Sequence, residues 1–446
     1  AGVAAAVNAG GGNVWLAEGT YATAPLSLPA GIALQGGFAH DFALATRDAE
    51  AHVTRIRGTA GLFVLEIFGG GGSVALDGLV VDANHAASFG VDVDSTDAQL
   101  GALVVENSAS HGLRLRDTSS VGAVHVDLAG SWVRGSAGEG LSLAGTFKLG
   151  LYGSRFSANA REGVSLGQLV AKNGLSASLH VRDCAFAGNG EDGLDCQLGR
   201  PPVIAGSSSF AVTIERSLFE ENGWNSGGLP IAGLRVDIDY ELVPNWSSDI
   251  LVRGCTARAN RGDGIFLDLD AASTTLLHRV LASGNTADGL RVSSETASAL
   301  AVASNSAFTG NLGAGARVHL GNVPLAATHC IFGGNVQGGL VSSNVTSTAS
   351  SSVAWLGGTP YSGARAHFSA TVADEFTPVF TNVPVEYQRV ASFDGTDVVL
   401  ASASSFAAGD RVEIADDGVA RTIDSVLGPA RFHVTPVPAA LATPAS

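Results

Sequence analysis

The stretch Phe186-Ala-Gly-Asn189-Gly-Glu-Asp-Gly193-Leu-Asp-Cys196 carries the pattern that decides the fold. An earlier copy reads Phe156-Ser-Ala-Asn159-Ala-Arg-Glu-Gly163-Val-Ser-Leu166. Further copies centre on Asn222, Asn260, Asn285, Asn311 and Asn335. Successive asparagines are separated by 30, 33, 38, 25, 26 and 24 residues. A recurrence of this length is typical of a solenoid, in which each repeat forms one coil.

Apolar residues alternate inside each unit, as Val212 and Ile214 or Leu234, Val236 and Ile238 show. A period of two indicates strands, whereas ankyrin and tetratricopeptide repeats need helical periodicity. Three short strands per unit, stacked about 4.8 Å from the next unit, form a parallel β-helix. We therefore predict an all-β solenoid of roughly a dozen coils.

Each repeated position has an expected structural role. The Gly before the third strand is expected to adopt a backbone conformation closed to other residues. The stacked asparagines are expected to bond to one another as a ladder, and the Phe residues to stack in the core. Cys184, Cys255 and Cys330 stand where other coils carry Ser, so buried free thiols are expected. A Cys184–Cys196 disulfide within one coil is the alternative.

Composition restricts the partners. The formal net charge is −16 and the sequence pI is about 5.0, which argues against nucleic acid or an anionic membrane as a partner. No apolar run approaches the length of a membrane-spanning helix. The chain contains no Met and starts at Ala1. We therefore expect a processed or trimmed piece of a secreted protein.

The chain is expected to have three parts. Residues 1–12 form an N-terminal cap, which covers the open end of the solenoid. Residues 13–384 form the parallel β-helix. Residues 385–446 form a small β-barrel or β-sandwich module, with strands at 385–393, 397–400, 411–415 and 430–435 and a turn at Asp416-Asp417-Gly418. This module is either a second cap or a docking module for a partner.

Two columns of side chains should point outward after each repeated Gly. The column two residues after the Gly contains Asp92, Arg114, Ser142, Ser165, Asp195, Arg235, Phe266, Arg291 and Arg317. The column four residues after it contains Asp94, Arg116, Ala144, Gly167, Gln197, Asp237, Asp268, Ser293 and His319. We expect exposed ion pairs between Asp92 and Arg114 and between Asp94 and Arg116.

The middle of this face holds the candidate site. Asp237 should lie beside Asp268, and Asp239 beside Asp270, so these four carboxylates are the candidate catalytic residues. Their separation would suit a retaining glycosidase, and Asp237 with Asp268 would equally suit Ca²⁺. The candidate ligand-binding residues are Trp224, Arg235, Trp246, Phe266, Arg291, Arg317 and His319. Exposed rings beside carboxylates are typical of sugar-binding grooves, but a solvated, ion-paired surface explains the same residues.

A further column comprises the acidic residues immediately before the Gly, which are Glu139, Glu162, Asp192, Asp263 and Asp288. Asp-Gly and Glu-Gly are ordinary turn sequences, so we expect these carboxylates to extend into water, with a calcium ladder as the alternative. His111, His180 and His278 are expected to make local hydrogen bonds.

The opening segments, 13–21 and 26–38, resemble the first coil of pectate-lyase-like right-handed β-helices. The Phe-x-x-Asn copies at 156–159, 186–189, 219–222, 308–311 and 332–335, together with Gln35-Gly-Gly-Phe38, resemble passenger repeats of polymorphic outer-membrane adhesins. This resemblance covers about residues 13–345. It implies a right-handed β-helix on the outer cell surface or secreted, with a polysaccharide or cell-surface partner and self-association into larger assemblies.

The signatures of polygalacturonases and the Asp-Pro-His motif of alginate epimerases are absent from the sequence. We therefore expect a non-enzymatic structural or adhesive surface protein, able to bind carbohydrate. The alternative is a polysaccharide lyase or glycoside hydrolase that uses the outward-facing carboxylates, with Ca²⁺ as its only expected cofactor.

Overall fold

The fold was obtained as a computed structural model. It describes residues 2–69, 72–118, 122–169, 176–198, 209–225, 231–238, 247–269, 273–294, 299–319, 323–342, 347–350, 353–355, 361–362, 366–369, 372–373, 390–394, 397–400, 408, 411–413, 420–428 and 431–435. The chain divides into two compact units, Ala1–Phe376 and Thr377–Ser446.

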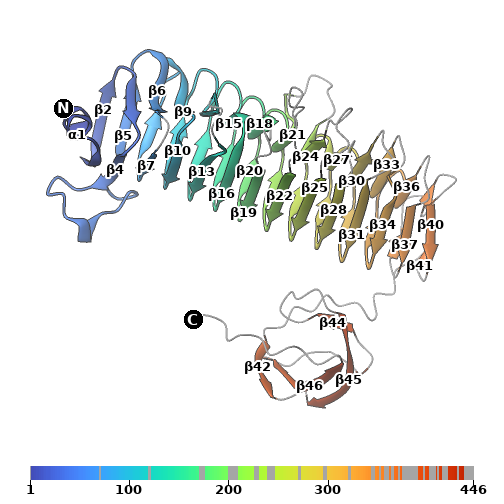
Figure 1. The fold of residues 1–446 in the computed structure, drawn as a ribbon. Coiled ribbons are helices and arrows are strands. Elements are labelled where there is room, and N and C mark those ends of the chain that lie inside the picture. The colour runs from blue at the N-terminus through green and yellow to red at the C-terminus, as the bar shows by residue number, and fades with distance from the viewer. Residues whose placement is uncertain are drawn as a thin grey trace. The chain divides into compact units, whose positions relative to one another are not determined.

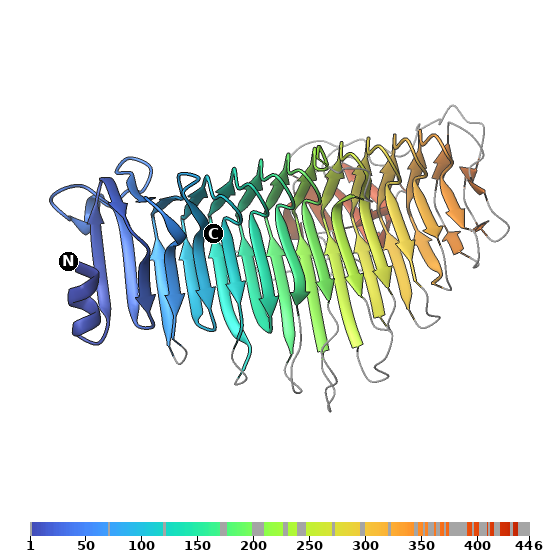
Figure 2. The ribbon, with the colours of Figure 1, turned by 90° about the horizontal axis from the view of Figure 1, so that it is seen from above.

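The first unit is a right-handed parallel β-helix built from three parallel sheets (Figures 1 and 2). Sheet A contains β1 (Gly12–Ala17), β4 (Ile32–Phe38), β7 (Ser73–Asp77), β10 (Asp97–Gly101), β13 (Val124–Ala129), β16 (Phe147–Tyr152), β19 (Ala177–Arg182), β22 (Ser209–Glu215), β25 (Ser247–Arg253), β28 (Ser273–His278), β31 (Leu300–Ser304), β34 (Leu325–Thr328), β37 (Ser347–Ser350) and β40 (Ala366–Ser369). Sheet B contains β2 (Gly19–Thr23), β5 (Thr54–Gly58), β8 (Val80–Asp82), β11 (Val104–Glu106), β14 (Trp132–Arg134), β17 (Arg155–Ser157), β20 (Ala185–Ala187), β23 (Leu218–Glu220), β26 (Thr256–Arg258), β29 (Leu281–Ser283), β32 (Ala307–Thr309), β35 (Ile331–Gly333), β38 (Val353–Trp355) and β41 (Val372–Ala373). Sheet C contains β3 (Leu26–Pro29), β6 (Gly61–Phe68), β9 (Ala87–Asp94), β12 (Leu113–Arg116), β15 (Leu141–Gly145), β18 (Val164–Leu169), β21 (Leu194–Leu198), β24 (Ala232–Ile238), β27 (Asp263–Leu269), β30 (Leu290–Ser293), β33 (Ala316–His319), β36 (Leu340–Ser342) and β39 (Tyr361–Ser362).

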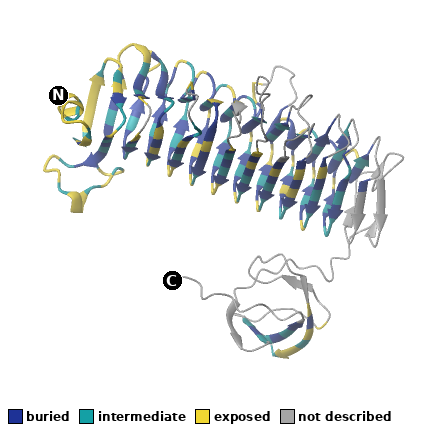
Figure 3. Cartoon of the chain, viewed as in Figure 1, coloured by how far each residue is buried: buried dark blue, intermediate teal, exposed yellow. Residues whose placement is uncertain are grey.

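Every third strand joins the same sheet, so each coil supplies one strand to each of the three sheets. Along the strands, buried and more exposed residues alternate, as Figure 3 shows. The predicted parallel β-helix is therefore confirmed. Helix α1 (Gly2–Asn8) precedes the first coil, and its Val3 and Ala6 pack against the core; a short 3₁₀ turn, η1 (Leu44–Thr46), interrupts an early connection.

The predicted asparagine ladder is confirmed. From Asn159 to Asn335, each side-chain Nδ2 donates to Oδ1 of the asparagine in the next coil, at 2.9–3.0 Å. The same Nδ2 also donates to a backbone carbonyl of the preceding coil, as Asn222 does to Phe186 at 3.1 Å. These amides are buried, and their mutual bonds satisfy groups that would otherwise be costly to remove from water.

Aromatic rings stack beside the ladder. Phe186 lies 5.3 Å from Phe156 and 4.9 Å from Phe219, between ring centroids, with interplanar angles of 7° and 6°. Phe308 and Phe332 form a second stack at 5.5 Å. Ala257 and Ala282 occupy the two intervening coils, so the stack is interrupted there.

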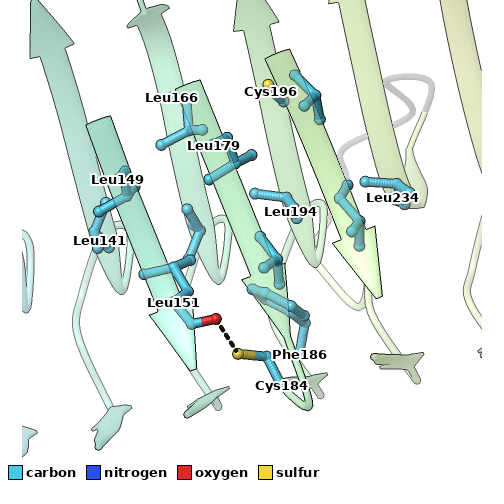
Figure 4. Packing of buried hydrophobic residues seen from close by; sticks show 14 of the residues in the cluster. Leu141, Leu149, Leu151, Leu166, Leu179, Cys184, Phe186, Leu194, Cys196 and Leu234 are labelled. Carbon is cyan, nitrogen blue, oxygen red and sulfur yellow. Dashed lines mark hydrogen bonds between the residues drawn. The ribbon is translucent and has the colours of Figure 1, made fainter. Parts of the chain in front are cut away.

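All four cysteines are buried and free, so the Cys184–Cys196 disulfide is excluded. Cys184 Sγ donates to the Leu151 carbonyl at 3.3 Å, across the coil boundary (Figure 4). Burial raises the pKa of the Cys184, Cys255 and Cys330 thiols to about 11. They remain protonated donors in the slot that Ser fills elsewhere.

The expected reason for the repeated Gly was wrong. Gly163, Gly193 and Gly264 do not have a left-handed backbone; it is the residue before the Asn that does, as at Ala158 (φ 54°) and Gly188 (φ 62°). A Cβ on Gly193 would lie 2.5 Å from the Gly233 carbonyl oxygen and 2.8 Å from Asn222 Nδ2. The Gly is required because the next coil is too close for any side chain.

Two further expectations need correction. A bulge in β18 places Gln168, rather than Gly167, opposite Ala144.

The second unit forms an antiparallel sheet in the order β42–β43–β46–β45–β44. Its strands are β42 (Val390–Asp394), β43 (Asp397–Leu400), β44 (Arg411–Glu413), β45 (Ala420–Gly428) and β46 (Arg431–Thr435). Strand β45 was not predicted from the sequence. The expected turn at 416–418 lies outside the described residues.

Gly193→Ala should lower the free energy of unfolding by about 3 kcal/mol, because its Cβ meets backbone and ladder atoms of the next coil. Gly188→Ala is the matched control. Its Cβ meets nothing within 4 Å, so the change should cost only the strain of a left-handed alanine, about 1–2 kcal/mol. Urea unfolding of the two variants measures both costs, and equal losses would contradict the crowding explanation.

Candidate functional site

The two outward columns of sheet C are in register across the middle coils, as expected. Asp195 pairs with Arg235, which pairs in turn with Phe266. Beyond Phe266 the column continues through Arg291 and Arg317. In the second column the order is Gln197, Asp237, Asp268, Ser293 and His319. Asp237 and Asp268 are thus neighbours on β24 and β27, whereas Asp239, Asp270 and Trp246 lie outside the described residues.

Phe266 does not offer an open ring face. Only 7% of the residue is exposed, because the guanidinium groups of Arg235 and Arg291 lie on either side, each 5.2 Å from the ring centroid. Both guanidinium groups make cation–π contacts with the ring, and the expectation that this ring binds a sugar face is not supported by its burial.

Trp224 differs from Phe266 in its exposure. It lies on the connection between sheets B and C and is 48% exposed, while its Nε1 donates to the Gly188 carbonyl at 3.0 Å. The hydrogen bond fixes the edge of the ring and leaves part of its surface in water. Among the described candidates, Trp224 is the aromatic residue able to contact a ligand.

Arg235 links two acidic neighbours on sheet C, Asp237 and Asp195. Its Nη2 donates to Asp237 Oδ2 at 3.1 Å, and its Nε lies 3.8 Å from Asp195 Oδ1. Asp195 is nearly inaccessible, and burial raises its pKa to about 6 even though Arg235 and a hydrogen bond from Gln197 act in the opposite direction. Asp195 is therefore a perturbed carboxyl group that the sequence analysis did not select.

The acidic residues before the Gly do not extend into water, so that prediction was wrong. All five are buried, because the turn directs their side chains against the next coil. Asp192 Oδ1 accepts a hydrogen bond from the Ala232 amide at 2.5 Å, and Asp263 Oδ1 accepts one from the Asp288 amide at 2.8 Å. Burial raises the pKa of Asp263 to about 6.

Arg317 is held firmly at the far end of the face. Its Nε donates to Asp288 Oδ2 at 2.6 Å and its Nη2 donates to Gln337 Oε1 at 2.6 Å. Arg291 lies farther from its acid, with Nη1 3.9 Å from Asp263 Oδ2. Burial, together with Arg291 and Arg317, lowers the pKa of His319, so this imidazole is neutral near pH 7.

The ion pairs expected at the N-terminal end of sheet C exist but are not exposed. Asp92 is 0% exposed and receives two hydrogen bonds each from Arg114 and Arg116. Arg116 also lies 3.2 Å from Asp94. The exposure was mispredicted because the two guanidinium groups of the next coil cover the Asp92 carboxylate.

The three histidines make local contacts, and His278 makes the expected local hydrogen bond. His111 contacts Glu139 and stacks on Phe89 with 5.4 Å between ring centroids. His278 Nδ1 lies 2.9 Å from Ser304 Oγ, and His180 meets the Tyr152 ring edge-on.

A metal site is not formed by the described part of the chain, where no group of three or more His, Cys, Asp or Glu could hold a metal ion. Asp237 and Asp268 alone offer at most four carboxylate oxygens, fewer than the six to eight oxygen ligands that Ca²⁺ takes. The expected Ca²⁺ therefore remains a prediction that depends on Asp239 and Asp270.

The residues that sequence reasoning missed are the buried acids Glu162, Asp192 and Asp195. Burial raises the pKa of Glu162 to about 7 and raises that of Asp192 well above its ordinary value. For Glu162 and Asp192 the signal was present: an acidic residue occupies the same place in successive repeats, directly before a Gly that admits no side chain. Because this position lies so close to the next coil, the next coil covers its side chain.

Comparisons with known proteins establish no family. No family model matches the chain, and no curated protein matches it. Among solved structures, the A-module of Azotobacter vinelandii mannuronan C-5 epimerase AlgE6 is similar at 14% identity, with 83% of this chain and 93% of that chain covered and a TM-score of 0.48. Pectate lyase Pel9A has 13% identity, coverage of 87% and 89%, and a TM-score of 0.38. PfbA, a surface adhesin of Streptococcus pneumoniae, has 11% identity, coverage of 89% and 92%, and a TM-score of 0.33.

Within the described residues, no helix combines the length and the hydropathy that crossing a bilayer requires.

Phe266→Ala should lower the free energy of unfolding by about 3 kcal/mol, because the ring is packed between two guanidinium groups. Trp224→Ala should change it by only about 0.5 kcal/mol, since half of that residue is already in water. Urea denaturation of both variants tests this assignment. A negligible effect at Phe266 would mean that its ring is free on the surface.

Proposed function

We propose that this protein is an extracellular or cell-surface β-helix that binds a polysaccharide along the outer face of sheet C and acts in adhesion or surface structure. The observation that carries the proposal is the in-register polar array on β24, β27, β30 and β33. Successive strands present Arg235 with Asp237, Phe266 with Asp268, Arg291 with Ser293, and Arg317 with His319.

The spacing of this array suits a linear ligand. Neighbouring strands are about 4.8 Å apart, so a chain lying across them meets a new pair of side chains at every coil. Both donors and acceptors are present, as hydroxyl-rich ligands require. The array requires no movement of distant segments to assemble, because all of its side chains belong to one continuous sheet.

The array is also held rigid before any ligand arrives. Asp288 and Gln337 fix Arg317, and the ring of Phe266 separates Arg235 from Arg291. Side chains that are already ordered lose less conformational entropy when they bind. Trp224 adds a partly exposed ring, whose face can cover the apolar face of a sugar.

The domain division and location are part of this proposal. Residues 1–12 would cap the solenoid of residues 13–384, and residues 385–446 would form a module that caps it or docks to a partner. The resemblance of the repeats to passenger repeats of adhesins supports a secreted or outer-surface location and self-association.

A polysaccharide-cleaving enzyme is the second candidate. It is favoured by one observation, the in-register carboxylates Asp237 and Asp268 on adjacent strands. Retaining glycosidases use two carboxyl groups about 5–5.5 Å apart, one as nucleophile and one as acid and base. Asp239 and Asp270 would extend the same pair into the next outward position.

Trp224→Ala should weaken glycan binding by about three- to tenfold, which corresponds to the loss of one stacking contact. His319→Ala should also weaken it, because His319 ends the polar array. Thr213→Ala, on the outer face of sheet A, is the control and should leave affinity unchanged. The measurement is a glycan array followed by calorimetric titration of the strongest ligand.

The proposal fails if no acidic or neutral polysaccharide binds, or if both sheet C variants bind like the parent. Incubation with the bound polysaccharide and mass spectrometry of the products separates the two functions. New oligosaccharides that disappear in Asp268→Asn would establish the enzyme. Unchanged cleavage in Asp268→Asn would exclude its carboxylate from the reaction.

A further inference from the structure

The middle of the solenoid contains an acid cluster, which we define as Glu162, Asp192 and Asp195. Glu162 and Asp192 precede β18 and β21 in neighbouring coils, where the Gly163 amide donates to the Asp192 carbonyl at 3.0 Å. Asp195 lies on β21 itself. The three residues are 7%, 5% and 3% exposed, respectively. Three carboxyl groups are thus removed from water within two adjacent coils.

Two other buried carboxylates of sheet C, Asp92 and Asp288, have full sets of donors. Asp92 accepts four hydrogen bonds from Arg114 and Arg116, at 2.7–3.3 Å. Asp288 accepts the Ala314 amide at 2.6 Å and two bonds from Arg317, at 2.6 and 3.1 Å. In each case, ionisation is compensated by cations and by donors in good geometry.

Two members of the acid cluster, Glu162 and Asp195, lack such compensation. Within the described structure, no donor reaches Glu162 Oε2 or Asp195 Oδ1, although both atoms are buried. Arg161 Nη2 is 3.5 Å from the other oxygen of Glu162, and Arg235 Nε is 3.8 Å from Asp195 Oδ1. These are the nearest cations, and neither completes a hydrogen bond to the orphaned oxygen.

The two guanidinium groups are also shared with other acids. Arg161 bonds Glu139 at 2.8 Å and lies 3.3 Å from Glu191. Arg235 bonds Asp237 at 3.1 Å. The described charged groups around the cluster are therefore Glu139, Glu191 and Asp237, with Arg161 and Arg235 as cations and His111 facing Glu139. Acidic groups outnumber the cations that face them.

Burying an ionised carboxylate without a hydrogen-bond donor costs free energy, and such a carboxylate usually takes up a proton instead. We propose that Glu162 and Asp195 bind protons when the chain folds, so that the coils of β18, β21 and β24 form a proton-dependent clasp. The clasp tightens in mildly acidic surroundings and loosens above neutral pH. This inference does not depend on the proposed polysaccharide site.

The directions of the pKa shifts of Glu162 and Asp195 agree with proton uptake on folding. Burial raises the pKa of Glu162 from 4.5 to about 7 and that of Asp195 from 3.8 to about 6. Because the folded state holds these protons more tightly than the unfolded chain, their stabilising effect is complete below the unfolded values. It is lost as the pH rises through about 6 to 7. Stability should therefore fall between mildly acidic and mildly alkaline pH.

The test compares urea unfolding of the parent with that of Glu162→Gln and Asp195→Asn at about pH 5.5 and about pH 8.5. The amides imitate the protonated acids, so each should raise the folding equilibrium constant at the alkaline pH by about tenfold or more. Each should also reduce the dependence of stability on pH. Asp92→Asn is the matched control, because Arg114 and Arg116 pair with that carboxylate; it should lose stability at both pH values and keep the parent's pH dependence.

The proposal is overturned if the parent's stability does not fall across this range, or if both amide variants retain the parent's slope. If the variants do not fold, a second measurement on the parent tests the proposal. Calorimetric unfolding of the parent in buffers of different ionisation enthalpy should show protons released on unfolding near neutral pH, and no release would reject the idea. If Ca²⁺ restores alkaline stability to the parent but not to Glu162→Gln, a cation rather than a proton completes the cluster.

Discussion

The rest of this structure depends on the hydrogen-bonded ladder of buried asparagine side chains between sheets B and C. Each amide bonds the amide of the next coil and a carbonyl of the previous one, so it fixes the turn in three coils at once. The residue before the Asn supplies the left-handed backbone that the turn needs. With this turn repeated from Asn159 to Asn335, these coils enter sheet C in the same register.

The ladder also limits the size of the side chains that fit beside it. In the coils beside the ladder, the Gly at the start of the sheet C strand, such as Gly193, approaches the next coil so closely that a Cβ would meet both the ladder amide and a carbonyl. The side chain immediately before this Gly then lies under the following coil. Acidic residues at that position are consequently buried, although an Asp-Gly pair in an ordinary turn would be solvated.

Electrostatics on sheet C follow from how well each buried acid is matched by an arginine of a neighbouring coil. Asp92 and Asp288 are matched by bidentate partners, whereas Asp195 has Arg235 at a distance and shares it with Asp237. Arg235 also flanks Phe266 together with Arg291, and both arginines belong to the polar array on which ligand binding is proposed. The same side chains therefore contribute to stability and to the proposed ligand binding. Arg235 belongs to both, because it faces Asp195 of the proton-dependent clasp and is part of the polar array.

Much of this arrangement was determined by the sequence alone, because a β-helix repeats a local pattern. The spacing of Asn, Gly and alternating apolar residues predicted the coils, the ladder, and the pairing of Asp237 with Asp268 across a long insertion. Burial could not be predicted in this way. Whether Asp92, Glu162 or Phe266 is covered depends on the side chains of the adjacent coil, and the bulge at Gln168 changes which residues are adjacent. Only the tertiary structure decided the charge states and accessible surfaces, because desolvation and pairing act between coils rather than along the chain.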